Sequence, residues 1–268
     1  MNRLSWKAYF IVAVSLLVIW LALRATLLAA EPVSARYFPL EKGNYWIYQG
    51  ETRWVEPQRG GRRSGRLQAK CAVLTWKMEV ADTLSGNGWR AALLKGFPSE
   101  LSWYEPGLVR GDHLVLQVGA DSYYLFHESD AREIWSGLKK GGPLAPGVAT
   151  AESLFFTAPL ARGRIYGGSR QNIKRGLYCW TAKGERPFDA NLFPNAPVVP
   201  PGREFTLVYA TTPDDTTVNF VPGLGMVAYH YRHHGTPAET TLTLVEFGTP
   251  KPVPAASQES PTPGESGD

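Results

Sequence analysis

The segment LTWKMEV (residues 74–80) shows the pattern that decides the fold. Apolar residues occupy positions 74, 76, 78 and 80, and polar residues stand between them. An alternation with period two predicts a β-strand that buries one of its faces. The segment SGNG (85–88) follows, and Asn and Gly accept the positive φ angles of a tight hairpin turn. The alternation recurs in EFTLVY (204–209), so antiparallel strands are predicted in both halves of the chain.

The composition agrees with a chain of strands and turns. The 268 residues are 44% hydrophobic and 19% charged, which excludes a wholly disordered chain. The 27 Gly and 21 Pro favour many turns, for example at Pro106-Gly107 and Pro222-Gly223. We therefore predict an all-β fold in which a large antiparallel sheet curves into a half-barrel or a barrel.

One short helix and an internal repeat complete the predicted architecture. Asp130 and Glu133 have the spacing of a capping box, and Gly141 can end a helix over about residues 130–140. Turn residues recur with an offset of 116 to 120 positions, which suggests repeats at 37–128 and 157–247. Each repeat would be a meander of about six strands, and the helix would bridge them.

Residues 1–30 read as an export signal. Arg3 and Lys7 precede an apolar run that Arg24 interrupts, which is typical of either a cleaved signal peptide or an uncleaved membrane anchor with a transmembrane helix. In both cases the positive end stays in the cytoplasm and the rest is exported to the periplasm or cell surface. Without these three cations, 25 basic residues face 24 acidic ones, so the composition argues against nucleic-acid binding.

The remaining chain reads as a single β domain at residues 31–248. The stretch 249–268 holds five prolines with Ser, Gly and Glu, and we expect it to be a disordered tail. The segment RGGRRSGR (59–66) is expected to be a solvated basic loop.

Two motifs resemble those of exported bacterial β-rich proteins of unknown function. YFPL (37–40), followed by Gly43-Asn44, Trp46 and Tyr48, resembles their usual beginning. FVPGLGMV (220–227) resembles their closing hairpin. The resemblance implies an extracytoplasmic β domain, and it implies no activity.

The histidines of YHYRHH (229–234) are the strongest candidates for metal ligands in the sequence. On a strand His230 and His234 lie about 13 Å apart, so zinc would need a further ligand from His113, His127 or a carboxylate elsewhere. We predict no metal site there and a solvated face instead. Asp214-Asp215 is expected to cap a turn.

Catalytic and cofactor motifs are equally weak. No G-x-S-x-G elbow is present, and the two G-x-G-x-x-A matches fall in hairpins rather than at the start of a helix. We therefore predict neither catalytic residues nor a cofactor.

The two cysteines, Cys71 and Cys179, suggest a disulfide because an exported chain meets an oxidising compartment. The sequence leaves their pairing open, since it cannot show that they meet.

Aromatic residues on predicted strands either fill the core or line a ligand pocket, and the sequence does not separate these roles. They include Trp46, Tyr48, Trp76, Trp103, Trp180, Phe205 and Tyr209. Our leading hypothesis is a non-catalytic envelope binding or assembly domain for a hydrophobic small molecule or another envelope protein. The alternatives are a hydrolase of cell-wall or extracellular polymer and a purely structural tethered module.

Overall fold

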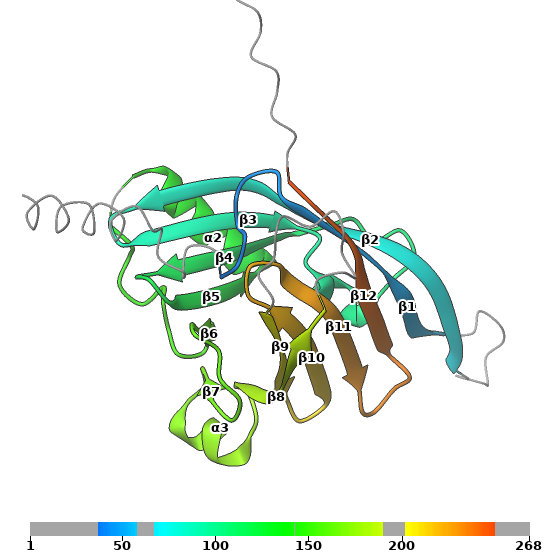
Figure 1. Cartoon of the computed structure of the whole chain (residues 1–268). Helices are drawn as coiled ribbons and strands as arrows, with labels where there is room; N and C mark the ends of the chain where they lie inside the picture. Colours follow the sequence, from blue (N-terminus) through cyan, green and yellow to red (C-terminus); the bar gives the residue numbers. More distant parts are fainter. Residues whose placement is uncertain (1–36, 58–66, 142, 190–201, 250–268) are drawn as a thin grey trace, which may run out of the picture.

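The computed structural model describes residues 37–57, 67–141, 143–189 and 202–249 (Figure 1). Within these ranges the chain forms twelve strands and three short helices. They are β1 (Tyr45–Pro57), β2 (Leu67–Gly86), β3 (Trp89–Lys95), η2 (Pro98–Trp103), β4 (Asp112–Val118), β5 (Ser122–His127), α2 (Glu128–Lys139), β6 (Leu154–Thr157), β7 (Ile165–Tyr166), α3 (Arg170–Arg175), β8 (Trp180–Phe188), β9 (Gly202–Ala210), β10 (Asp214–Val221), β11 (Gly225–His233) and β12 (Glu239–Gly248).

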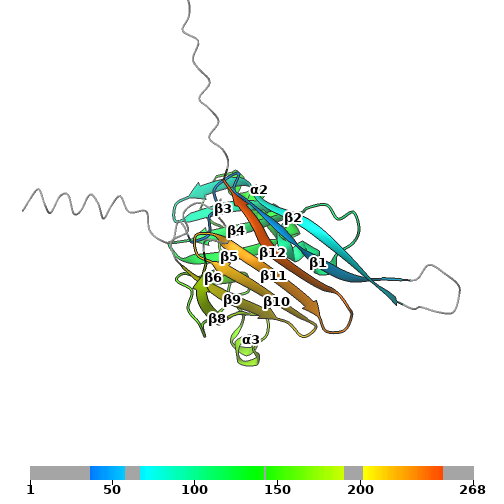
Figure 2. The ribbon, with the colours of Figure 1, turned by 45° about the vertical axis from the view of Figure 1, so that its right-hand side comes forward.

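All twelve strands belong to one sheet, in the order β6-β5-β4-β3-β2-β1-β12-β11-β10-β9-β8-β7. The hydrogen-bonded pairs are antiparallel, and β1 joins the first strands to the last ones by pairing with both β2 and β12. The sheet is strongly twisted and curved (Figures 1 and 2). Its outermost strands β6 and β7 contact each other, so the sheet bends almost into a barrel. The predicted all-β fold is confirmed.

The strand predicted from the alternation in residues 74–80 and the turns predicted from Asn-Gly and Pro-Gly form at the predicted positions. In β2, the side chains of Trp76, Met78 and Val80 are buried and those between them are more exposed. The Asn87-Gly88 turn joins β2 to β3, with φ of +77° at Gly88. The Pro222-Gly223 turn likewise joins β10 to β11.

The inner face of the sheet holds the main core, and its centre lies where the two ends of the chain meet. Phe38 packs edge-on against Phe220, with ring centroids 5.3 Å apart. The indole N–H of Trp46 donates to the carbonyl of Leu224 at 2.7 Å, and the Tyr48 hydroxyl donates to the carbonyl of Met226 at 3.0 Å. Segments 37–48 and 220–227 therefore pack directly against each other.

The helix α2 covers the opposite face of β4 and β5. Its buried residues Ala131 and Trp135 belong to a second apolar cluster with Leu114, Leu116 and Phe126. This helix begins at Glu128, two residues earlier than predicted, because β5 runs directly into it.

The capping-box prediction for α2 is wrong. His127 is the N-cap and makes no side-chain cap hydrogen bond, and Asp130 lies inside the first turn. Gly141, with φ of +73°, does follow the helix end. The helices η2 and α3 have no counterpart in the sequence-based prediction.

Several predictions concern residues that the structure does not describe. The leader (1–30), the basic loop (59–66) and nearly all of the tail (249–268) lie outside the described ranges. Among the described residues no helix is long and apolar enough to span a membrane. The internal repeat stays a prediction, although β1–β6 and β7–β12 contribute six strands each to the sheet.

We predict that Gly225→Ala destabilises the fold more than Gly107→Ala does. Both glycines have φ near +90°, and a Cβ at that φ costs about 1–2 kcal/mol. A Cβ on Gly225 would also lie 2.9 Å from the Phe38 ring, whereas a Cβ on Gly107 would meet open space. Crowding of this kind costs about 1–3 kcal/mol more. Urea unfolding of both variants measures the difference, and equal losses would contradict the packing described here.

Candidate functional site

The aromatic residues named from the sequence mostly fill the core. Trp46, Tyr48, Trp76 and Phe205 are buried on the inner face, and Trp180 is half-buried against the same cluster. Tyr209 packs on Trp180 with ring centroids 5.2 Å apart. The sheet interior is therefore occupied by the chain's own side chains.

Trp103 corrects the prediction that these aromatics lie on strands. It ends η2, its side chain is 57% exposed, and its ring packs edge-on against His233 at 4.9 Å. Period two does not describe this segment because the chain turns as a 3₁₀ helix between β3 and β4.

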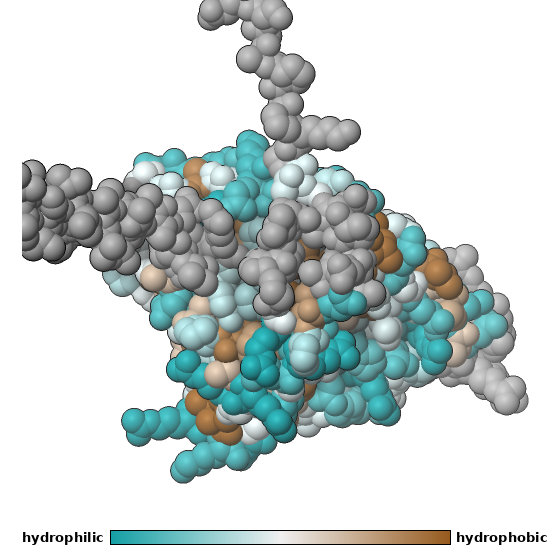
Figure 3. Space-filling view, in the orientation of Figure 1, coloured by the Kyte–Doolittle hydropathy of each residue, from teal (hydrophilic) through white to brown (hydrophobic). Residues whose placement is uncertain are grey.

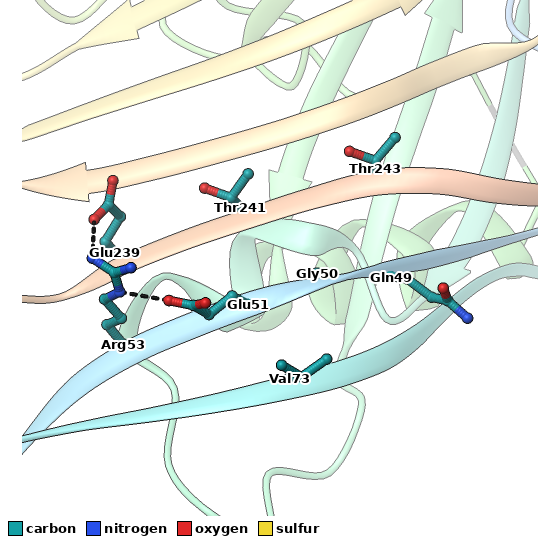
Figure 4. Close-up of a pocket in the computed structure, with 8 residues that line it drawn as sticks. All are labelled: Gln49, Gly50, Glu51, Arg53, Val73, Glu239, Thr241 and Thr243. Atoms are coloured by element: carbon teal, nitrogen blue, oxygen red, sulfur yellow. Dashed lines mark hydrogen bonds and ion pairs between the residues drawn. The ribbon is translucent and has the colours of Figure 1, made fainter.

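A cleft of about 450 Å³, lined by both polar and apolar surface, lies on the outer face of β1, β2 and β12 (Figure 4). Arg53 crosses it, with Nε 2.5 Å from Oε1 of Glu51 and Nη1 3.7 Å from Oε2 of Glu239. The hydrogen bond from Arg53 lowers the pKa of Glu51. The lining residues are Gln49, Gly50, Glu51, Arg53, Val73, Glu239, Thr241 and Thr243.

Gly50 allows the close approach of strands beneath this cleft. A Cβ at this position would lie 1.9 Å from the carbonyl oxygen of Thr241, a distance that no side chain tolerates. Glycine therefore permits β1 and β12 to come together here.

The strand β2 has a free edge beside the cleft, which we define as residues 68–76. Over residues 67–78 β2 pairs with β1 alone, because its pairing with β3 begins at Glu79. Val80 exchanges backbone hydrogen bonds with Gly43 and Asn44, so even-numbered residues of β2 face β1. The N–H and C=O groups of Ala69, Cys71 and Val73 therefore point outward from the sheet edge.

Cys71 and Cys179 are both free thiols. Five strands separate β2 from β8 in the sheet order, and adjacent strands are about 4.8 Å apart. Cys71 is exposed and its thiol hydrogen-bonds Glu51, which raises its pKa. Cys179 is buried, and burial raises its pKa. The bridge considered from the sequence is absent from this structure.

We predict that a thiol reagent distinguishes the two cysteines. In the native, non-reduced protein Cys71 should react and Cys179 should react only after unfolding, because its side chain is 1% exposed. Mass spectrometry after alkylation with and without urea counts the modified sites. Recovery of a Cys71–Cys179 linked peptide would contradict this assignment.

The histidines of residues 229–234, in β11 and just after it, each interact with a different partner. His230 Nε2 lies 3.1 Å from Glu239 Oε1, and His234 Nε2 lies 2.8 Å from Asp215 Oδ2. His233 Nδ1 accepts from the backbone N–H of Thr236 at 2.8 Å, which fixes the β11–β12 turn. Among the described residues no three His, Cys, Asp or Glu side chains come together as a metal site.

Asp214 closes the β9–β10 turn through Thr211.

His113 and His127 meet each other on the inner face rather than joining the β11 histidines. Nε2 of His113 lies 3.0 Å from Nδ1 of His127, and Phe97 stacks on the His113 ring at 5.1 Å. Desolvation, with the neighbouring His113 second, lowers the pKa of His127 to about 4. His127 is thus neutral at pH 7.

We predict that stability falls as the pH drops from about 6.5 to about 4. The pKa of His127 is lower in the folded state than the usual 6.5, so the unfolded chain binds the proton more tightly across this window. His127→Gln should flatten the dependence of Tm on pH there, whereas His234→Gln, at an exposed histidine paired with Asp215, should keep it. An unchanged slope in His127→Gln would contradict the lowered pKa of this side chain.

Sequence reasoning missed Ser99 and Glu100, which flank His113, and the free edge of β2. The one available signal was Pro98, at the start of the segment PSELSW (98–103), because proline favours the first position of a helical turn. An unpaired edge leaves no trace in the alternation, because period two reports which face of a strand is buried and not which strands it pairs with.

Comparisons with known proteins give distant likenesses only. No family model matches the chain, and no curated protein matches it. A protein described as exported and of YmcC-like fold, from Bacteroides fragilis, aligns at 8% identity with a TM-score of 0.34, covering 80% of this chain and 99% of that one. A protein described as a lipoprotein, from Parabacteroides distasonis, aligns at 10% identity with a TM-score of 0.33, covering 79% and 98%. At this distance neither carries an argument about function.

Proposed function

We propose that this chain is an exported envelope domain that binds a partner protein by strand addition at the free edge of β2. An extended segment of another chain adds to an exposed sheet edge through main-chain hydrogen bonds. The observation that carries the proposal is the run of outward-pointing backbone groups at residues 69–75 of β2. For these groups no backbone partner exists within the described part of the chain.

The sheet interior favours a protein partner over a hydrophobic small molecule. Large aromatic side chains fill the inner face, and a carrier of an apolar ligand needs an apolar cavity there. The face seen in Figure 3 is mainly hydrophilic, with hydrophobic residues in small separate patches.

The side chains around the free edge define the chemistry of the partner. Val73 is 83% exposed and faces outward, so it offers one apolar contact. Lys70 lies within the edge, and four arginines occur in the sequence between β1 and β2. We infer that the partner segment is extended, carries carboxylates and has an apolar residue that packs on Val73.

Residues 1–30 support the proposal that this domain is exported, because their charge and apolar run are typical of a signal peptide or anchor. Envelope location would place β2 where other exported proteins are available as partners. Whether the leader is cleaved or retained does not change the edge, because β2 begins 37 residues after the leader ends.

We predict that Val73→Pro leaves the fold intact and that Leu74→Pro does not. The N–H of Val73 points away from β1, so proline there removes no hydrogen bond of the sheet. The N–H of Leu74 faces β1, and its loss together with steric conflict should cost about 3 kcal/mol. Urea unfolding of both variants measures the difference, and a large loss in Val73→Pro would show that its N–H is engaged in the fold.

The binding test uses the full chain in its own cells. A photo-crosslinking amino acid at Thr75, which is exposed beside Val73, should give a discrete adduct with another envelope protein. Val73→Pro in the same chain should remove that adduct, and the same probe at Arg132 on α2 should give none. An adduct that survives Val73→Pro, the absence of any adduct, or an adduct with a second copy of this chain would contradict the proposal.

A further inference from the structure

The helix η2 places a serine and a glutamate on opposite sides of one imidazole ring. Oγ of Ser99 lies 3.2 Å from Nε2 of His113. On the other side of the ring, Oε1 of Glu100 lies 3.3 Å from Nδ1 of His113. Both atoms are buried, and among the described residues neither makes a hydrogen bond, so they are neighbours at ion-pair distance. The three groups therefore lie in a row: the carboxylate of Glu100, the imidazole of His113 and the hydroxyl of Ser99.

The surrounding structure holds this arrangement in place. Oε2 of Glu100 accepts the backbone N–H of Gly111 at 2.8 Å, and Phe97 stacks on the His113 ring. The helix itself is tied to the sheet, because Thr240 Oγ1 donates to the carbonyl of Leu101 at 2.7 Å. A fixed orientation of the base is what a nucleophilic serine requires.

The side chains of this cluster differ in solvent exposure, and the serine is more exposed than the carboxylate and the imidazole. The side chains of Glu100 and His113 are 5% and 3% exposed, so water does not reach them freely. Ser99 is half-buried, and the neighbouring His127 is exposed. Buried carboxylate and solvent-facing hydroxyl are the two ends of a Ser-His-acid arrangement.

We propose that Ser99 is the nucleophile of a second, catalytic site that cleaves O-acyl esters, with His113 as general base and Glu100 as its orienting carboxylate. In the reactive complex Glu100 would accept the Nδ1 proton of His113 across the 3.3 Å that separates Oε1 from Nδ1, which would leave a lone pair on Nε2 facing Ser99. This assignment is independent of strand addition at β2, because no residue of the cluster belongs to the free edge.

The reaction proceeds in two balanced steps. Oγ of Ser99 bonds to the acyl carbon while its proton passes to Nε2 of His113. The bond from that carbon to the leaving oxygen then breaks, and the oxygen keeps the electron pair and takes the proton from His113. Water repeats the sequence on the acyl-Ser99 ester: its oxygen bonds to the acyl carbon, and Oγ of Ser99 leaves and regains a proton.

His127 contributes to the electrostatics of this site. Its Nδ1 lies 3.5 Å from Oγ of Ser99 and 3.0 Å from Nε2 of His113. A positive charge at this distance would oppose proton transfer to His113. His127 is neutral at pH 7, so it places no positive charge beside His113.

The experiment treats the full chain with a fluorophosphonate probe, which reacts covalently with an activated serine. Peptide mass spectrometry should place the adduct on Ser99. The Ser99→Ala variant should lose it, and His113→Gln should label at least 10²-fold more slowly. Ser102→Ala is the matched control, because Ser102 lies in the same helix, is also half-buried and hydrogen-bonds Tyr229 instead of a histidine. It should label like the wild type.

Hydrolysis of p-nitrophenyl acetate gives the second readout. Ser99→Ala should abolish turnover above the rate of free imidazole, and Ser102→Ala should retain it. Circular dichroism of these two variants verifies folding, so the test stands even where His113→Gln fails to fold. An unlabelled wild type, an adduct on another residue, or turnover that survives Ser99→Ala would overturn the proposal.

Discussion

The pairing of β1 with both β2 and β12 is the constraint on which the rest of the structure depends. It brings the two ends of the described chain into one sheet, and the large side chains of β1 fill the core that results. Trp46 and Tyr48 donate to carbonyls of the β10–β11 hairpin, so buried polar groups are satisfied as the sheet closes. Gly225 leaves the space that the Phe38 ring needs.

The same arrangement produces the cleft and the free edge. The strand β2 is longer than its neighbour β3, and the chain between β3 and β4 turns inward as η2 instead of extending the sheet. Residues 68–76 therefore have a partner on one side only. Natural proteins guard such edges against unwanted pairing, often with lysine, and Lys70 is the one lysine within residues 68–76.

The inward turn of η2 also brings polar residues into an apolar core. Glu100 and His113 are costly to bury. Oε2 of Glu100 accepts the N–H of Gly111, and Oε1 of Glu100 lies 3.3 Å from Nδ1 of His113 without forming a hydrogen bond. Leu101 contributes the apolar contact that holds the helix against the sheet. One short segment thus both opens the edge of β2 and forms the serine-histidine-glutamate cluster.

The sequence by itself determined the strands, the hairpin turns and the all-β class. Alternation in residues 74–80 and 204–209 and the Gly-containing turns are local properties, which depend only on side-chain period and allowed φ angles. Three features follow from the tertiary structure alone: which strands become neighbours, that Cys71 on β2 and Cys179 just before β8 are free thiols, and that Ser99 meets His113 and His127. These contacts join residues from different elements, and their positions follow from how the whole sheet closes around its core rather than from any local pattern.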